Sequence, residues 1–93
     1  MKNIEVGSLV ISKAGRDCGE LYMVWAVKKN ILELVNGDTK KMENPKRKNS
    51  KHVIATDKVL KGIAEKIKAD KKIFDSEIYS AVKNSAENLD KNI

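Results

Sequence analysis

This sequence contains few of the side chains that perform covalent or metal chemistry. Among its 93 residues there is one cysteine, Cys18, and one histidine, His52. A single cysteine cannot form an intramolecular disulfide, which favours a reducing compartment, and these two side chains are too few for a structural zinc site. They could in principle act as a nucleophile and a base, but a turn cysteine and a histidine beside a basic loop is the more common arrangement. Because the sequence also lacks a P-loop, a dinucleotide-binding fingerprint and suggestively spaced carboxylate pairs, we expect no enzymatic activity, metal, cofactor or small-molecule substrate.

Long hydrophobic segments are also absent. The longest apolar run is Leu21–Val27, whereas a helix needs about 20 apolar residues to span a bilayer. At the N-terminus, Lys2 is soon followed by Glu5, without the apolar stretch of a secretory signal. We therefore expect a cytoplasmic protein that has no membrane partner.

What the sequence does contain is positive charge concentrated in one segment. The formal net charge at pH 7 is +6. Residues 40–51 hold six basic side chains against Glu43 alone, and so contribute +5 of that charge. A dense cationic patch on a small domain attracts polyanions.

The first half of the chain has the pattern of short β-strands separated by turns. Gly15 and Gly19 mark one turn, and Asn36–Gly37 is the pair typical of a type I′ hairpin. Several short strands at this spacing suggest a small barrel. The expected strands are Leu9–Ser12, Leu21–Val27, Ile31–Val35, an exposed lysine-rich edge strand Asp38–Met42 and, after an irregular basic loop begun by Pro45, His52–Ala55.

The second half has helical periodicity. A first helix, with Thr56 or Asp57 as its N-cap, has an apolar stripe at Leu60, Ile63, Ala64 and Ile67. A second helix begins near Asp75 and has its stripe at Ile78, Ala81, Val82, Ser85 and Leu89. These stripes must be buried on each other, on the barrel or on a partner. We therefore expect an α+β chain in which residues 1–56 form a barrel with a basic loop at 40–52, and residues 57–93 form a helical extension.

Residues 4–19, which read IEVGSLVISKAGRDCG, resemble a KOW motif. The shared pattern is a leading glycine, an apolar strand, a glycine-containing loop and a second apolar strand. The likeness is to KOW-type proteins of the large ribosomal subunit in archaea and eukaryotes, and to short bacterial KOW-domain RNA-binding proteins. It extends through Asn36–Gly37 to residues 45–52, a little over half of the chain, and the helices after Thr56 are similar to the tail of the short bacterial group. Cys18 and Glu20 depart from the pattern, because many KOW loops have small or basic residues at these positions.

The resemblance implies an SH3-like barrel of about five strands that binds ribosomal RNA or associates with ribosomes. KOW domains also occur in transcription elongation factors, where the partner can be a protein. Since a fold alone does not determine function, both kinds of partner stay open at this point.

The basic loop is the main candidate binding site. Clustered lysine and arginine neutralise RNA phosphates and release counterions, and Arg47 adds a planar group that can bind a phosphate through two hydrogen bonds. A second surface is the loop between Gly15 and Gly19, although a turn that simply needs glycine explains this loop equally well. The expected RNA-binding residues are Lys46, Arg47, Lys48, Lys51, His52, Asn49, Lys13, Arg16, Lys40 and Lys41.

Aromatic residues are too scarce to suggest base stacking. The chain has one tryptophan, two tyrosines and one phenylalanine, and Tyr22 and Trp25 lie at odd spacing on one expected strand, where we expect core packing. Contact with phosphates and with folded RNA shape is therefore expected. The resulting hypothesis is a non-catalytic, ribosome-associated RNA-binding protein whose partners are ribosomal or other structured RNA and ribosomal proteins. The alternative is an adaptor that docks on a ribosomal or transcription partner through the barrel and helices, with the basic loop serving only solubility.

Overall fold

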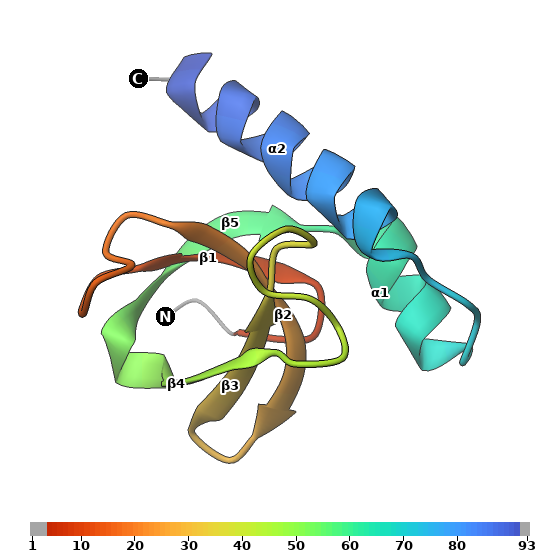
Figure 1. The fold of residues 1–93 in the computed structure, drawn as a ribbon, viewed down its shortest axis with the longest axis horizontal. Coiled ribbons are helices and arrows are strands. Elements are labelled where there is room, and N and C mark those ends of the chain that lie inside the picture. The colour runs from red at the N-terminus through yellow and green to blue at the C-terminus, as the bar shows by residue number, and fades with distance from the viewer. Residues whose placement is uncertain (1–3, 92–93) are drawn as a thin grey trace.

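The chain folds into a five-stranded antiparallel sheet followed by two helices, which confirms the expected α+β class (Figure 1). The computed structural model describes the backbone of residues 4–91 and the side chains of residues 4–87. Its elements are β1 (Ser8–Ser12), β2 (Leu21–Lys28), β3 (Ile31–Val35), β4 (Lys46–Asn49), the short 3₁₀ helix η1 (Ser50–His52), β5 (Val53–Val59), α1 (Lys61–Lys68) and α2 (Asp75–Lys91). Within the described residues, no helix is both long and apolar enough to cross a membrane.

The strands form a barrel-like sheet in the order β4-β3-β2-β1-β5, with every neighbouring pair antiparallel. Successive side chains of a strand point to opposite faces of the sheet. One face carries the inner core of the barrel, made by Val10, Tyr22, Val24, Leu32, Leu34 and Val53. Leu9, Met23 and Val35 alternate with inner-core residues and therefore point to the opposite face, where they are also fully buried. The sheet is apolar on both faces.

The two helices cover the outer face of the sheet. Ile63 of α1 and Ile78 and Val82 of α2 are buried together with Leu9, Met23 and Val35 in a second core. The helices lie outside the barrel in Figure 1, with α1 beside it and α2 crossing above it. An ion pair between Lys66 and Glu77 joins the two helices, and the hydrogen bond from Lys66 lowers the pKa of Glu77. The apolar stripes of the helices are therefore buried on the barrel through residue 85, and Leu89 lies outside the described side chains.

The expected edge strand at Asp38–Met42 is wrong, because residues 36–45 form a loop. The Asn36 side-chain oxygen accepts hydrogen bonds from the backbone N–H groups of Asp38 and Lys40, both at 2.9 Å, so Asn36 organises this wider loop instead of a two-residue hairpin. Asp75 of α2 accepts a hydrogen bond from the Met42 N–H at 2.9 Å. Docking of the loop on α2 thus overrides the local turn preference.

The position of β4 corrects a second expectation. It forms at Lys46–Asn49, inside the segment expected to be an irregular basic loop. The loop before β4 depends on glycine at position 37. Gly37 has a φ of 77°, and a Cβ atom at this position would overlap the backbone of Asp75 and Tyr79. The chain therefore passes tightly against the start of α2 before it enters β4.

The first helix begins later than expected, so the prediction that Thr56 or Asp57 caps it is wrong. Both residues lie in β5, which continues from Val53 to Val59, and the Thr56 hydroxyl donates a hydrogen bond to the Leu9 carbonyl oxygen at 2.7 Å. Pairing of β5 with β1 extends to Ser8 opposite Val59. This longer pairing delays α1 until Lys61, whereas α2 begins at Asp75 as expected.

Candidate functional site

The basic residues of β4 lie on two different faces of the sheet. Lys46 and Lys48 are register partners of Leu34 and Leu32, whose side chains belong to the inner core. Arg47 is the partner of Glu33 and therefore points to the outer face. Three adjacent charges that look equivalent in the sequence thus have different surroundings.

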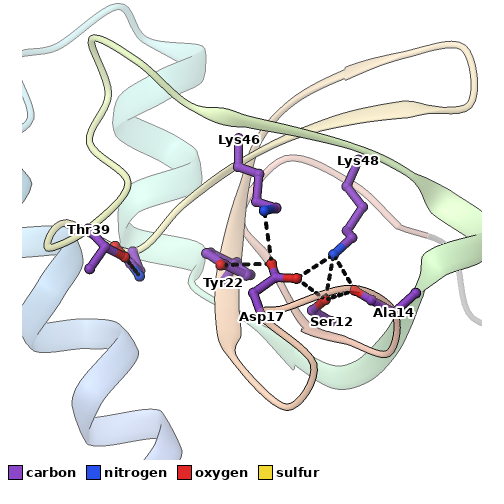
Figure 2. Close-up of polar contacts among 8 residues, drawn as sticks. Ser12, Ala14, Asp17, Tyr22, Thr39, Lys46 and Lys48 are labelled. Carbon is purple, nitrogen blue, oxygen red and sulfur yellow. Dashed lines mark hydrogen bonds and ion pairs between the residues drawn. The ribbon is translucent and has the colours of Figure 1, made fainter.

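Lys48 is held by partners inside the protein (Figure 2). Its Nζ atom donates to the Asp17 carboxylate at 2.7 Å, to the Ser12 hydroxyl at 2.6 Å and to the Ala14 carbonyl oxygen at 2.8 Å. These contacts use all three N–H groups of the ammonium, and the side chain is only 10% exposed. Lys48 was expected to bind phosphate, but the structure places it in an internal ion pair.

Asp17 is the centre of this polar cluster. Its Oδ1 atom faces Lys48 and the Ser12 hydroxyl, and its Oδ2 atom accepts a hydrogen bond from the Tyr22 hydroxyl at 2.9 Å and pairs with Lys46 at 3.4 Å. Burial alone would raise the pKa of Asp17, but the hydrogen bonds from Lys48, Tyr22 and Ser12 outweigh burial and hold that pKa far below its ordinary value. In the folded protein the carboxylate therefore stays charged at pH values below the ordinary pKa of an aspartate.

The Asp17 cluster, which we define as Ser12, Asp17, Tyr22, Lys46 and Lys48, joins opposite sides of the sheet. β4 is an edge strand, whereas Ser12 ends β1, which lies next to the other edge strand β5. The ion pairs therefore link β4 to the β1–β2 loop across the barrel, as Figure 2 shows. Charged side chains that point inward from an edge strand also discourage pairing with a strand of another molecule.

The sequence contained a signal for this cluster. The spacing of Lys46 and Lys48 is that of one face of a strand, and Asp17 is the acidic residue of a loop that also carries Lys13 and Arg16. Sequence reasoning missed Asp17, Ser12 and Tyr22 as partners because β4 is polar on both faces, so it lacks the apolar alternation that identifies a strand.

The remaining expected binding residues divide by exposure. Lys40, Asn49 and His52 are half-buried, and Asn49 caps η1 by accepting a hydrogen bond from the Lys51 N–H at 3.0 Å. Five residues are exposed and have no ion-pair partner among the described residues, namely Lys13, Arg16, Lys41, Arg47 and Lys51. Among the expected binding residues, these five have a charge that is available to a ligand.

Four of the exposed residues belong to segments that meet at the cluster and η1, although Arg47 itself points to the outer face of the sheet. The Lys13 N–H donates to the His52 carbonyl oxygen at 3.0 Å, which places Lys13 beside η1 and Lys51. Arg16 precedes Asp17 in the loop that is tied to β4, and β4 carries Arg47 and leads directly into η1. We call Lys13, Arg16, Arg47 and Lys51 the exposed basic set.

A cleft of about 400 Å³ lies between the β1–β2 loop and the β3–β4 loop. Its lining includes Arg16, Lys40 and Lys46, together with the carboxylates of Glu20 and Asp38. Because charges of both signs line it, the cleft is less suited to a lone phosphate than the exposed basic set. Among the described residues, no group of three histidine, cysteine or acidic side chains is arranged to hold a metal ion.

The phenol of Tyr22 should resist ionisation. Burial, followed by the hydrogen bond to Asp17 and the negative charge of Asp17, raises its pKa well above the ordinary value of 10.0. Folding therefore retains a proton that the unfolded chain loses above pH 10, so stability is intact below pH 10 and falls as the pH rises beyond it.

This effect is measurable by ultraviolet titration of a Tyr79→Phe variant, in which Tyr22 is the remaining tyrosine. We expect tyrosinate to form only as circular dichroism shows unfolding. Ionisation near pH 10 in a chain that retains its native spectrum would contradict the Asp17–Tyr22 contact.

Comparison of the chain with models of known protein families and with curated proteins finds no match. The functional interpretation therefore depends on the sequence pattern and on the geometry described above.

Proposed function

We propose that this protein is a non-catalytic RNA-binding protein of the KOW type that acts in the cytoplasm in association with ribosomes. The observation that carries the proposal is the exposed basic set, whose four charges have no ion-pair partner among the described residues. A surface cation without an acidic partner can bind a phosphate without first breaking an ion pair, so these residues are suited to neutralising RNA phosphates.

The arrangement of the aromatic residues favours phosphate contact over base stacking. Tyr22 is buried in the inner core and Trp25 is half-buried against the outer core. Phe74 and Tyr79 are exposed, but they belong to the helical half of the chain, and Lys72 and Lys83 lie over their rings. No exposed aromatic ring among the described residues belongs to the strands or loops that carry the exposed basic set. Binding should therefore depend on shape and charge more than on base identity.

The side chains that we propose to contact RNA phosphates are not all the basic residues of the 40–51 segment. Lys48, and to a lesser degree Lys46, serve the Asp17 cluster, so their removal would change barrel stability as well as charge. Arg47 and Lys51 are the members of that segment that are exposed and lie in or beside β4. Lys13 and Arg16 add two exposed charges beside β1 and in the β1–β2 loop.

The proposal is tested by the salt dependence of binding to a fluorescein-labelled RNA stem-loop and to purified ribosomal RNA. If four phosphates are contacted, log affinity should fall with log salt with a slope of about −3 to −3.5. Poly-glutamate serves as a polyanion without phosphates or RNA shape, and should bind more weakly. Absence of RNA binding at low salt, or equal affinity for poly-glutamate, would reject the proposal.

An adaptor role is the second candidate, and a different surface favours it. Leu21, Tyr79, Val82 and Lys83 line a cleft of about 390 Å³ between α2 and the barrel, and the exposed Phe74 ring lies at the start of the same helix. Photo-crosslinkers placed at Arg47 and at Tyr79 in cells separate the two roles. RNA adducts at position 47 support the first candidate, whereas protein adducts at position 79 without RNA adducts support the adaptor.

A further inference from the structure

The turn between β2 and β3 contains a lysine in an unfavourable backbone conformation. Lys28 and Ile31 are register partners, so Lys29 and Asn30 alone connect the two strands. Lys29 has a φ of 56°. A side chain with a Cβ atom is disfavoured in this region, and two-residue hairpins normally place glycine, asparagine or aspartate there. A lysine is therefore kept at this position although it costs stability.

The strained turn is fixed against the segment that carries Lys51. The Asn30 carbonyl oxygen accepts a hydrogen bond from the Ser50 N–H at 2.8 Å, and Ile31 is the register partner of Asn49. On the other side of η1, the His52 carbonyl oxygen accepts from the Lys13 N–H. The hairpin tip, η1 and the end of β1 are thus three adjacent segments.

Each of these segments contributes one exposed lysine that lacks an acidic partner among the described residues, namely Lys29, Lys51 and Lys13. Lys28, the neighbour of Lys29, differs because its Nζ atom pairs with Glu33 at 3.0 Å. Like charges on adjacent segments repel one another, and a bound anion relieves that repulsion. Backbone strain kept at such a place is typical of a binding site.

We propose that Lys29 is a phosphate ligand for bound RNA and that Lys13, Lys29 and Lys51 form one track for the RNA backbone, which we call the lysine track. This inference rests on the proposed RNA-binding function and adds to it the hairpin tip, which lies outside both the basic segment and the β1–β2 loop. The lysine is retained in place of glycine because its charge contacts phosphate.

The test is a Lys29→Gly variant, which removes the strain and the charge together. We expect its melting temperature to rise by about 3–6 °C, because relief of an unfavourable φ is worth a few degrees in a chain of this size. We also expect the dissociation constant for the RNA stem-loop at 0.1 M salt to rise about five- to eightfold, and the salt slope to lose about 0.7 to 0.9, as for one lost phosphate contact. A gain in stability with a loss of affinity cannot result from poor folding.

Asp70→Gly is the matched control for strain. Asp70 is exposed, follows α1 and also has a φ of 56°, and α1 lies away from the β2–β3 tip in Figure 1. Because aspartate tolerates this backbone better than lysine does, its variant should show a smaller rise in melting temperature than Lys29→Gly, without weaker RNA binding. Lys68→Gln on α1 is the matched control for charge, and should bind RNA as the wild type does.

The outcomes separate this inference from the function on which it rests. If the wild-type protein does not bind the stem-loop, the proposed function fails and the lysine track fails with it. If the wild type binds but Lys29→Gly binds with the same affinity and slope, the lysine track alone is overturned. A Lys29→Asn variant, which removes the charge and tolerates this backbone, should lose the same affinity. Unchanged affinity in that variant would also overturn the inference.

Discussion

Replacing Asp17 with asparagine is expected to lower the free energy of unfolding by about 3–5 kcal/mol, the cost of leaving a buried ion without its partner. Asparagine keeps the size of the side chain but removes the charge that Lys48 and Lys46 share. Since the Lys48 side chain is only 10% exposed, water cannot replace the lost carboxylate. Urea denaturation followed by tryptophan fluorescence measures this change.

Two further variants show whether the loss belongs to the ion pair. Asp38→Asn removes an exposed carboxylate from a nearby loop and should change stability by less than about 0.5 kcal/mol. The double variant Asp17→Asn, Lys48→Met should recover much of the loss, because an apolar side chain needs no partner in the barrel. An Asp17→Asn protein as stable as the wild type would show that the cluster does not close the barrel.

The same cluster sets the acid limit of stability. The pKa of Asp17 in the folded protein is far below its ordinary value of 3.8, so unfolding takes up a proton when the pH is below about 4. The contribution of Asp17 is therefore fully present above pH 4 and is lost as the pH falls further. The stability difference between wild type and Asp17→Asn should shrink over that acidic range.

Replacing the whole exposed basic set with glutamine is expected to weaken binding to the RNA stem-loop about a thousandfold at 0.1 M salt. Each lost phosphate contact lowers log affinity by about 0.7 to 0.9 under these conditions. The salt slope should fall to about −0.7 to −0.9, the share of the one contact left to Lys29. Stability should change little, because Lys13, Arg16, Arg47 and Lys51 are exposed and pair with no described acidic residue.

The control is a second variant with an equal loss of charge on the helical side. Lys61, Lys68, Lys71 and Lys72 are all exposed, and their replacement by glutamine also lowers the net charge from +6 to +2. This protein should keep most of its RNA affinity. Equal losses in the two variants would mean that net charge alone attracts RNA, and no loss in either would show that the exposed basic set is not the RNA-binding site.

The architecture was predictable where apolar periodicity is strong. Apolar runs identified β1 and β2, and alternation identified β3. The spacing of Ile63, Ile78 and Val82 identified the helical stripes. Tyr22 and Trp25 pack on opposite faces, as their odd spacing predicts. In each case the buried positions of the element are apolar, so the spacing of apolar residues in the sequence indicates the type of element.

The errors occur where distant residues decide the local structure. Asn36–Gly37 is a strong hairpin signal, but contact of this loop with Asp75, which is distant in the sequence, selects a longer loop. Pairing with β1 extends β5 past Thr56, although Thr56 is a good helix cap in isolation. The roles of Lys46 and Lys48 depend on Asp17 in another loop, so charge counting treats them as free when they are paired.

The doubly apolar sheet has a consequence for synthesis of the chain. Leu9, Met23 and Val35 can pair within their strands once Val59 has emerged from the ribosome, but their outer face needs Ile78 and Val82 of α2. At about 5–20 residues per second, the stretch from Val59 to Ile78 takes roughly one to four seconds to translate. During that interval the outer face of the nascent sheet presents Leu9, Met23 and Val35 without the α2 side chains that bury them in the folded protein, and exposed apolar surface of this kind favours aggregation.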